Sequence, residues 1–287
     1  MSDVARRIAA AFEAACRDEL DAPKPGNVHL FASGHRMTAQ QFVDSAAAAS
    51  GPLAMPGMRV GWRIWTAVEA TSAAVGTNTN LGIVLLCAPL AAAAERHAAD
   101  LRGALADVLA DLDIEDATFA FRAILKASPA GLGRAERHDV SAPPRVSLRE
   151  AMAEAAGRDR IAAQYVSDFA DVFERGIPWF DAAMRRFGDR RWATLAAYLG
   201  FLSAFPDSHV ARKYGLETAE EVRREAMTYH ARLQVAATAH GLLDELLAWD
   251  ASLKTRLVNP GTSADLTVAT CFVDRLRNIL PFARNSD

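Results

Sequence analysis

The chain of 287 residues is 51% hydrophobic and 23% charged, with a formal net charge of −3. This composition is globular and provides enough apolar side chains for a sizeable core, and the near-neutral charge gives no electrostatic reason to expect a nucleic acid or an anionic membrane as a partner. The three cysteines, Cys16, Cys87 and Cys271, lie far apart without a CxxC pair, which argues against a disulfide framework or a zinc knot and favours reduced, buried thiols.

The first twenty residues carry charges throughout and lack the apolar block of a signal peptide. No uncharged apolar run is long enough to span a membrane, although residues 83–94 come nearest. We therefore expect a cytoplasmic protein that does not associate with membranes.

Nearly the whole chain is predicted to be helical, because Ala, Leu, Arg and Glu dominate and strand-like alternation is scarce. The expected helices cover residues 2–19, 38–50, 58–75, 82–100, 101–109, 113–126, 147–156, 160–174, 178–187, 191–204, 218–239, 241–257 and 264–280. Thr38 is the expected N-cap of the second helix, and the apolar residues 83–90 predict a helix that is buried on all sides. The simplest architecture is all-α, a single-domain multi-helix bundle over residues 1–287.

One break between helices is a run of small polar residues that leads into the most apolar helix: Gly76, Thr77, Asn78, Thr79 and Asn80. Such a turn can hold a phosphate, because the first N–H groups of a helix have no intrahelical partner and the helix dipole favours an anion. The alternative is an ordinary helix start with Thr79 or Asn80 as the N-cap.

Four carboxylates lie at helix ends or on apolar helix faces: Glu19, Glu69, Asp207 and Asp265. Each alone is explained as a helix cap, a first-turn acid or half of a surface ion pair. As a set they indicate Mg²⁺, because this ion prefers hard oxygen ligands and commonly bridges to substrate phosphates.

Basic side chains that could hold those phosphates lie close to the same breaks. Lys24 is fixed between two prolines, and Arg212 lies within two turns of Asp207. His209 is at the edge of a loop, where a histidine is a plausible acid or base. The alternative for Arg212 is a solvated helix face.

Five stretches, in order, resemble motifs of one enzyme family. Residues 22–29, APKPGNVH, match a T-P-K-P-G-L-V-D loop, and residues 35–37 partly match an H-x-D-M motif. Residues 75–82 correspond to a T-G-G-V-N-T-H-K-G turn, and residues 207–212 to D-T-N-x-x-x-R. Residues 259–266, NPGTSADL, match an N-P-G-G-S-A-D-L signature. On these motifs the chain resembles the triphosphoribosyl-dephospho-CoA synthase family, which makes the precursor of a prosthetic group on the acyl-carrier proteins of citrate lyase and malonate decarboxylase.

The resemblance has two departures. The His-Lys pair of the family's central turn is Asn80-Leu81, and the aspartate that ends the proline loop is His29. The TNTNLG form is similar to a divergent branch found in archaea and methylotrophic bacteria.

The resemblance implies an Mg²⁺-dependent transferase in which a ribose hydroxyl of dephospho-CoA attacks C1′ of ATP and adenine leaves. It implies catalytic roles for Glu69, Asp207 and His209, and metal binding by Glu19, Glu69, Asp207 and Asp265. Substrate and phosphate binding is expected at Lys24, Gly76, Thr77, Asn78, Thr79, Asn80, Arg212, Asn259, Gly261 and Ser263.

Two alternatives remain at this point. One is a divergent relative that acts on another nucleotide or precursor in the biosynthesis of a one-carbon carrier of the methanopterin or methanofuran type. The other is a non-catalytic nucleotide-binding protein. In each case we expect nucleotide partners, and a homodimer is left open.

Overall fold

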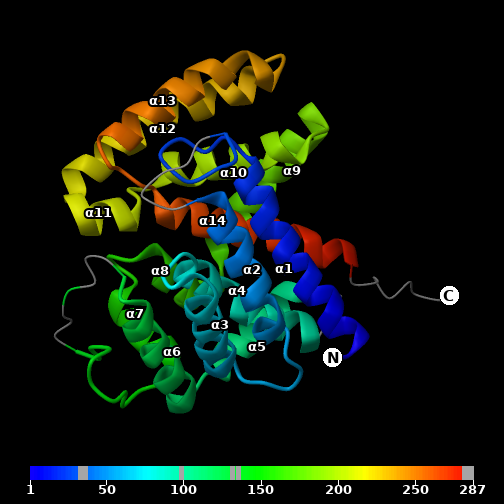
Figure 1. The fold of residues 1–287 in the computed structure, drawn as a ribbon, viewed down its shortest axis with the longest axis vertical. Coiled ribbons are helices and arrows are strands. Elements are labelled where there is room, and N and C mark those ends of the chain that lie inside the picture. Colours follow the sequence, from blue (N-terminus) through cyan, green and yellow to red (C-terminus); the bar gives the residue numbers. More distant parts are fainter. Residues whose placement is uncertain (32–37, 97–99, 130–132, 134–136, 280–287) are drawn as a thin grey trace. The chain divides into compact units, whose positions relative to one another are not determined.

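A computed structural model describes residues 1–31, 38–96, 100–129, 133 and 137–279. Over this part of the chain the structure contains fourteen α-helices, one π-helix, one 3-10 helix and no strand (Figure 1). The prediction of an all-α fold is confirmed. The partly matched motif at residues 35–37 lies outside the described residues.

The chain divides into two compact units. Unit 1 contains Met1–Ala15, Phe42–Phe169 and Phe272–Asp287, and unit 2 contains Cys16–Gln41 and Ala170–Cys271. Each unit therefore draws on separated stretches of sequence, and the expectation of a single domain stays a prediction.

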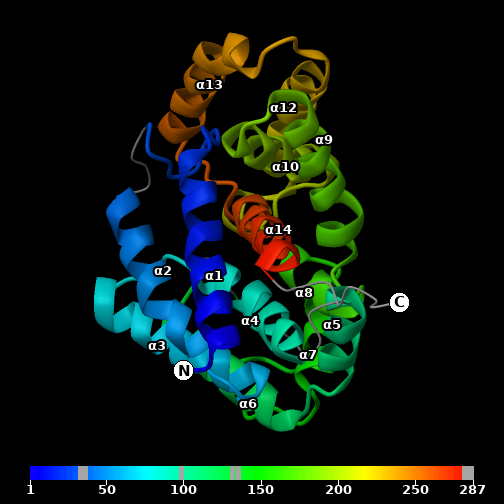
Figure 2. The same ribbon diagram turned by 90° about the vertical axis from the view of Figure 1, so that its right-hand side faces the viewer.

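The helices that contribute to unit 1 are α1 (Asp3–Asp21), α2 (Ala39–Leu53), α3 (Val60–Val75), α4 (Leu81–Arg96), α5 (Leu101–Ala110), α6 (Ile114–Ala127), α7 (Leu148–Ala155) and α8 (Arg160–Val166). Unit 2 contains the π-helix Val172–Gly176, α9 (Ile177–Phe187), α10 (Arg190–Ala204), α11 (Ser208–Tyr214), α12 (Leu216–Val235), the 3-10 helix Ala239–Leu242, α13 (Leu243–Thr255) and most of α14 (Gly261–Ile279). The unit boundary falls within α1, α2 and α14. Figure 2 gives a second view of these elements.

Helix α4 is the centre of the apolar core of unit 1. Thirteen of its sixteen residues are buried, as the all-round apolar pattern predicts. Helices α3, α5, α6 and α8 pack against it. Among the described residues no single helix is long and apolar enough to span a membrane, and α4 and α5 meet that criterion only as a pair bent by 113°.

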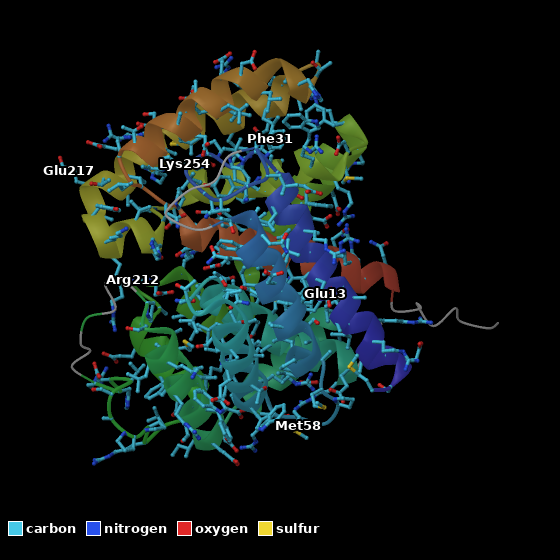
Figure 3. All side chains as sticks on the ribbon, viewed as in Figure 1. Glu13, Phe31, Met58, Arg212, Glu217 and Lys254 are labelled. Carbon is cyan, nitrogen blue, oxygen red and sulfur yellow. The ribbon has the colours of Figure 1, made fainter. Side chains whose placement is uncertain are left out.

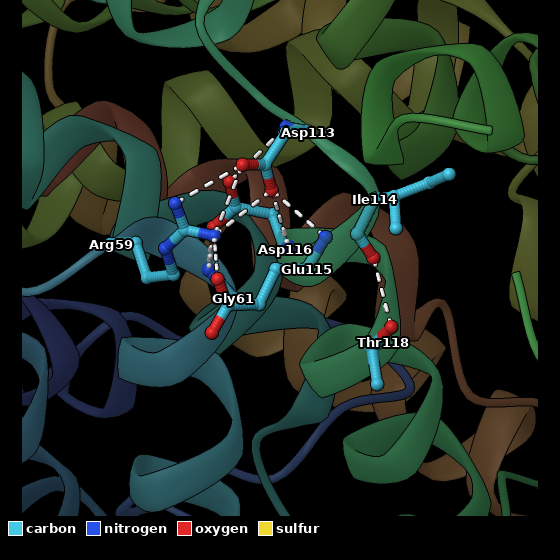
Figure 4. A network of polar contacts seen from close by, with 7 residues as sticks. All are labelled: Arg59, Gly61, Asp113, Ile114, Glu115, Asp116 and Thr118. Atoms are coloured by element: carbon cyan, nitrogen blue, oxygen red, sulfur yellow. Dashed lines mark hydrogen bonds and ion pairs between the residues drawn. The ribbon is translucent and has the colours of Figure 1, made fainter.

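The first turns of α3 and α6 are joined by a polar network (Figure 4). Asp113 caps α6, and Asp116 completes the capping box while its Oδ1 accepts the Gly61 N–H at 2.7 Å. A Cβ on Gly61 would lie 2.4 Å from the Asp116 carbonyl oxygen, so only glycine permits this approach. Arg59 bridges Asp113 and Glu115 across the two helix starts. The two helices therefore pack side by side from their first turns.

Two differences from the predicted helices have local causes. The expected helix over residues 160–174 ends at Val166, because Asp168 and Phe169 adopt left-handed φ angles of 49° and 58°. The short helix α11 lies in a stretch that was expected to be a break, because Asp207 caps it.

Candidate functional site

The proline loop is built around a buried ion pair. Lys24 Nζ lies 3.0 Å from Glu19 Oε1 and donates to the Val28 carbonyl at 2.8 Å, and both side chains are buried. Burial raises the pKa of Glu19 and lowers the pKa of Lys24, while each partner opposes the shift in the other. Lys24 therefore stabilises its own loop in this structure. A contact between Lys24 and phosphate, and between Glu19 and Mg²⁺, would need these bonds to be exchanged, so both roles stay predictions.

Asp250 of α13 fixes the other side of this loop. Its Oδ1 accepts the Gly26 N–H at 2.8 Å, and its Oδ2 lies 2.9 Å from Lys254 Nζ and 3.3 Å from His29 Nε2. Gly26 has a φ of 80°, and a Cβ there would lie 2.9 Å from the Pro260 side chain. The loop thus approaches α13 at a backbone position that only glycine fits.

The charges around His29 shift its titration. Burial lowers the pKa of the His29 imidazole, and the nearby Lys24 and Lys254 lower it further against the effect of Asp250. Burial alone would raise the pKa of Asp250, but its bonds to His29, Lys254 and Gly26 hold it below the ordinary value. His29 Nδ1 is buried without a hydrogen-bond partner among the described residues.

Three of the motif-bearing segments meet in unit 2. Asn27 Nδ2 donates to Asn259 Oδ1 at 2.8 Å, which joins the proline loop to the start of the NPGTSADL segment. Asp207 Oδ2 accepts from the backbone N–H and the hydroxyl of Ser263 at 2.7 and 2.8 Å. Segments from the beginning, the later part and the end of the chain therefore form one cluster.

Asp207 is a cap for two helices. Its Oδ1 accepts the N–H groups of His209 and Val210 in the first turn of α11, while its Oδ2 holds Ser263 in the first turn of α14. The side chain is buried, and both oxygens carry two bonds each. These four bonds position the starts of the two helices. A role of Asp207 as a base or as a metal ligand would need some of these bonds to be exchanged, so both roles stay predictions.

His209 and Arg212 lie three positions apart on α11. The His209 ring lies against Gly261, where a Cβ would approach its Cγ to 3.4 Å, and its backbone N–H also contacts Thr262 Oγ1 at 3.2 Å. His209 and Arg212 are half-buried, and Figure 3 shows Arg212 extending from α11 away from α12 and α13. Asp265, also half-buried, lies in the first turn and a half of α14.

The predicted phosphate turn lies in unit 1 and lines a cavity of about 220 Å³. Gly76 ends α3 with a left-handed φ of 69°. Asn78 Oδ1 accepts the Leu81 N–H at the start of α4, whereas Thr79 bonds Ser45 and Asn80 bonds Thr71. The residues around the cavity are Val68, Thr71, Ser72, Gly76, Thr77, Asn78, Asn80, Lys126 and Ala127. Four of the five residues of the predicted turn therefore face a common space, and Thr79 does not.

The carboxylates do not form a ready-made cage for a cation. Among the described residues, no group of three or more His, Cys, Asp or Glu side chains is arranged to hold a metal ion. Glu19 and Asp207 are committed to internal donors, and Glu69 is exposed on α3 in the other unit. Mg²⁺ commonly needs only one or two carboxylates beside substrate phosphates, so the binding of Mg²⁺ by this chain stays a prediction.

Asp250, Lys254 and Lys126 carry no distinctive signal in the sequence. Asp250 and Lys254 have the i, i+4 spacing of an ordinary surface pair, and Lys126 lies in the last turn of α6, where a cation complements the helix dipole. Only the folded chain brings the first two to the proline loop and the third to the Gly76–Asn80 turn.

Comparison with known proteins agrees with the motifs. The sequence model of the family described as ATP:dephospho-CoA triphosphoribosyl transferase (CitG) matches residues 5–283. Comparison with curated proteins gave no significant match. The crystal structure of a proposed triphosphoribosyl-dephospho-CoA synthase from Archaeoglobus fulgidus is 24% identical, with a TM-score of 0.62 over 83% of this chain and 99% of that chain, and shows the same fold. Because the family match covers nearly the whole chain, this protein belongs to the ATP:dephospho-CoA triphosphoribosyl transferase family and is a transferase.

Proposed function

We propose that this chain transfers the triphosphoribosyl group of ATP to dephospho-CoA and releases adenine, with Mg²⁺ bound to the triphosphate. The observation that carries the proposal is the meeting of the proline loop, Asp207 and the NPGTSADL segment in unit 2 through Asn27–Asn259 and Asp207–Ser263. These are the segments through which the chain resembles its family, and a binding site requires such distant segments to be held together.

The proposed reaction is a glycosyl transfer. The bond between C1′ of the ATP ribose and N9 of adenine breaks, and a bond from C1′ to a ribose hydroxyl oxygen of dephospho-CoA forms. The hydroxyl loses its proton and adenine gains one, while the triphosphate stays on the transferred sugar. The transition state resembles an oxocarbenium ion, so the site needs a proton donor for adenine and negative charge near C1′.

His209 is the proposed proton donor. It lies on a helix whose start Asp207 fixes, and its ring is held against the glycine that opens α14. Asp207 then acts through His209 as a positioning residue, since both of its oxygens are occupied. Arg212, three residues further on α11, is the proposed contact for substrate phosphate.

Asn259, Gly261 and Ser263 shape the same site from the start of α14. Asn259 accepts from Asn27 through its Oδ1, Ser263 donates to Asp207, and Gly261 lies beside the His209 ring. Their proposed contribution is therefore to hold the proline loop and α11 in place beside the substrate.

Mg²⁺ fits this chain as a partner of ATP. Glu69 in unit 1 and Asp265 in unit 2 are each proposed as a carboxylate ligand, because neither is buried. When bound, the ion would neutralise part of the triphosphate charge.

The direct test is to incubate the protein with ATP, Mg²⁺ and dephospho-CoA and to measure free adenine by chromatography. We expect adenine to appear only when both substrates are present, to disappear with a chelator, and to fall by about 10²–10⁴-fold in His209→Gln. Folded protein that releases no adenine would reject the reaction. Release with ATP and a different acceptor would favour the divergent relative, and nucleotide binding without turnover would favour a non-catalytic protein.

A further inference from the structure

The cavity beside the Gly76–Asn80 turn lacks the cations that the resembling family carries in that turn. Asn80 and Leu81 stand in place of the His-Lys pair, and both side chains are buried. Asn80 donates to Thr71 and to the Ser45 carbonyl inside unit 1. The turn itself therefore supplies no positive charge to the cavity.

A positively charged side chain from another helix lines this cavity. Lys126, in the last turn of α6, lines the cavity together with Thr71, Ser72 and Thr77. It comes there because α3 and α6 pack side by side from their joined first turns at Gly61 and Asp116. Among the described residues that line the cavity, Lys126 is the one cation and there is no carboxylate.

The Lys126 ammonium lies near an aromatic ring that it shares with a second cation. Its Nζ lies 6.0 Å from the centre of the Trp65 ring, and Arg122 lies over the same ring at 4.5 Å. Lys126 is exposed, so its side chain can turn between the ring and the cavity. The polar lining of hydroxyl and amide groups suits a phosphate chain, because it offers hydrogen-bond donors without a broad apolar face.

We propose that Lys126 binds the nucleotide triphosphate in this cavity and replaces the basic pair that the turn has lost. The identity of the ligand rests on the proposed function, whereas the binding of a polyphosphate does not require turnover. The ends of α3 and α6 and the start of α4 all lie at the cavity, so helix dipoles of opposite sign offset one another there. A polyphosphate therefore depends on Lys126 more than on any neutral donor of the turn.

Lys126 also has a purely structural explanation, since a cation in the last turn of a helix stabilises the helix. Arg96 provides a matched control. It lies exposed in the last turn of α4 in the same unit, pairs with Asp111 and does not line the cavity. A structural role would make Lys126→Gln and Arg96→Gln alike, whereas ligand binding separates them.

The test measures binding of inorganic tripolyphosphate, ATP and adenosine by titration calorimetry in the presence of Mg²⁺. We expect Lys126→Gln to bind tripolyphosphate and ATP about tenfold or more weakly, with adenosine unchanged, because one charge-assisted contact is lost. Lys126→Arg should retain most of the affinity, and Arg96→Gln should bind like the unmodified protein.

Two results would overturn the inference: no binding of tripolyphosphate by the unmodified protein, or affinities for Lys126→Gln within twofold of it. Thermal unfolding of each variant confirms that it is folded. Failure of the proposed function would give a different result from failure of this inference. Adenine release would be absent, while the Lys126-dependent binding of tripolyphosphate would persist.

Discussion

Asp250 shows how one buried carboxylate can organise a loop that contains no regular structure. It accepts from the Gly26 backbone, Lys254 and His29 at once. His29 stands where the family pattern has an aspartate, and here the carboxylate that faces it comes from α13. The network keeps His29 close to two lysines, so protonation of the imidazole to its positively charged form is unfavourable.

This arrangement predicts a loss of stability in mild acid. The folded pKa of His29 is lowered, so the unfolded chain takes up the proton first and the stabilising effect of neutral His29 fades as the pH falls below about 6.5. Between pH 7 and pH 5.5 we expect His29 to contribute a loss of up to about 1.4 kcal/mol in the free energy of unfolding.

The comparison is urea unfolding at both pH values for the unmodified protein and for His29→Gln. Burial raises the pKa of Glu19 and lowers the pKa of His230, but these groups are present in both proteins and cancel in the difference. The lowered pKa of Asp250 keeps its own effect below this pH window. An equal loss in the two proteins would contradict the role of His29.

At the scale of elements, Asp207 joins the starts of α11 and α14. A seven-residue helix such as α11 has little stability of its own, so it depends on its cap and its packing against α12. Asp207→Asn keeps the size of the side chain but turns an NH₂ group toward N–H donors. We expect it to lower the free energy of unfolding by about 2–4 kcal/mol, as measured by urea unfolding at pH 7.

Ser263→Ala is the matched control for this prediction. It removes only the hydroxyl bond to Asp207 and leaves the backbone N–H bond in place. We expect a loss of about 1 kcal/mol. If Asp207→Asn lowers the free energy of unfolding no more than Ser263→Ala does, the bonds of Asp207 to the two helix starts are not a main source of the stability of α11.

Most helices could be predicted from sequence because their signals are local. Thr38 and Gln41 form the expected capping contacts at the start of α2, and the apolar run in α4 is buried as its pattern requires. The early end of α8 could not be predicted, since nothing in the residue types indicates a left-handed Phe169. Helix α11 had a signal in Pro206-Asp207, but its shortness hides the helical period.

The contacts of the site were less predictable, because they join residues far apart in the chain. Gly26 and Asp250 are separated by 224 positions, and Asp207 and Ser263 by 56. The motifs identified which segments matter, but not that Asp207 would cap a helix or that Lys24 would pair with Glu19. Such roles depend on which donor is nearest after folding. The residues next to each of these side chains in the sequence do not indicate that donor.

At the scale of the whole molecule, the two units carry different polar groups. Unit 1 has the Gly76–Asn80 turn and Lys126 around a polar cavity, and unit 2 has the proline loop, His209 and the start of α14. A nucleotide of the proposed kind has two chemically different parts, a polyphosphate and a sugar with its base. The two sets of residues are therefore tested separately, Lys126 by the binding of tripolyphosphate and His209 by the release of adenine.

The proposed binding of ATP together with Mg²⁺ predicts how ligands change the thermal stability of the full chain. A ligand that binds only the folded state stabilises it by about 2.7 kcal/mol at a concentration of 100 times Kd, which is about 4–5 °C in Tm for a chain of this size. We expect that shift with ATP and Mg²⁺ together, and a smaller one with ATP and a chelator. Mg²⁺ alone should shift Tm little, because the described residues provide no preformed cation cage. A shift with Mg²⁺ alone as large as that with both would instead indicate a resident metal site, and would assign the ion to the protein rather than to the nucleotide.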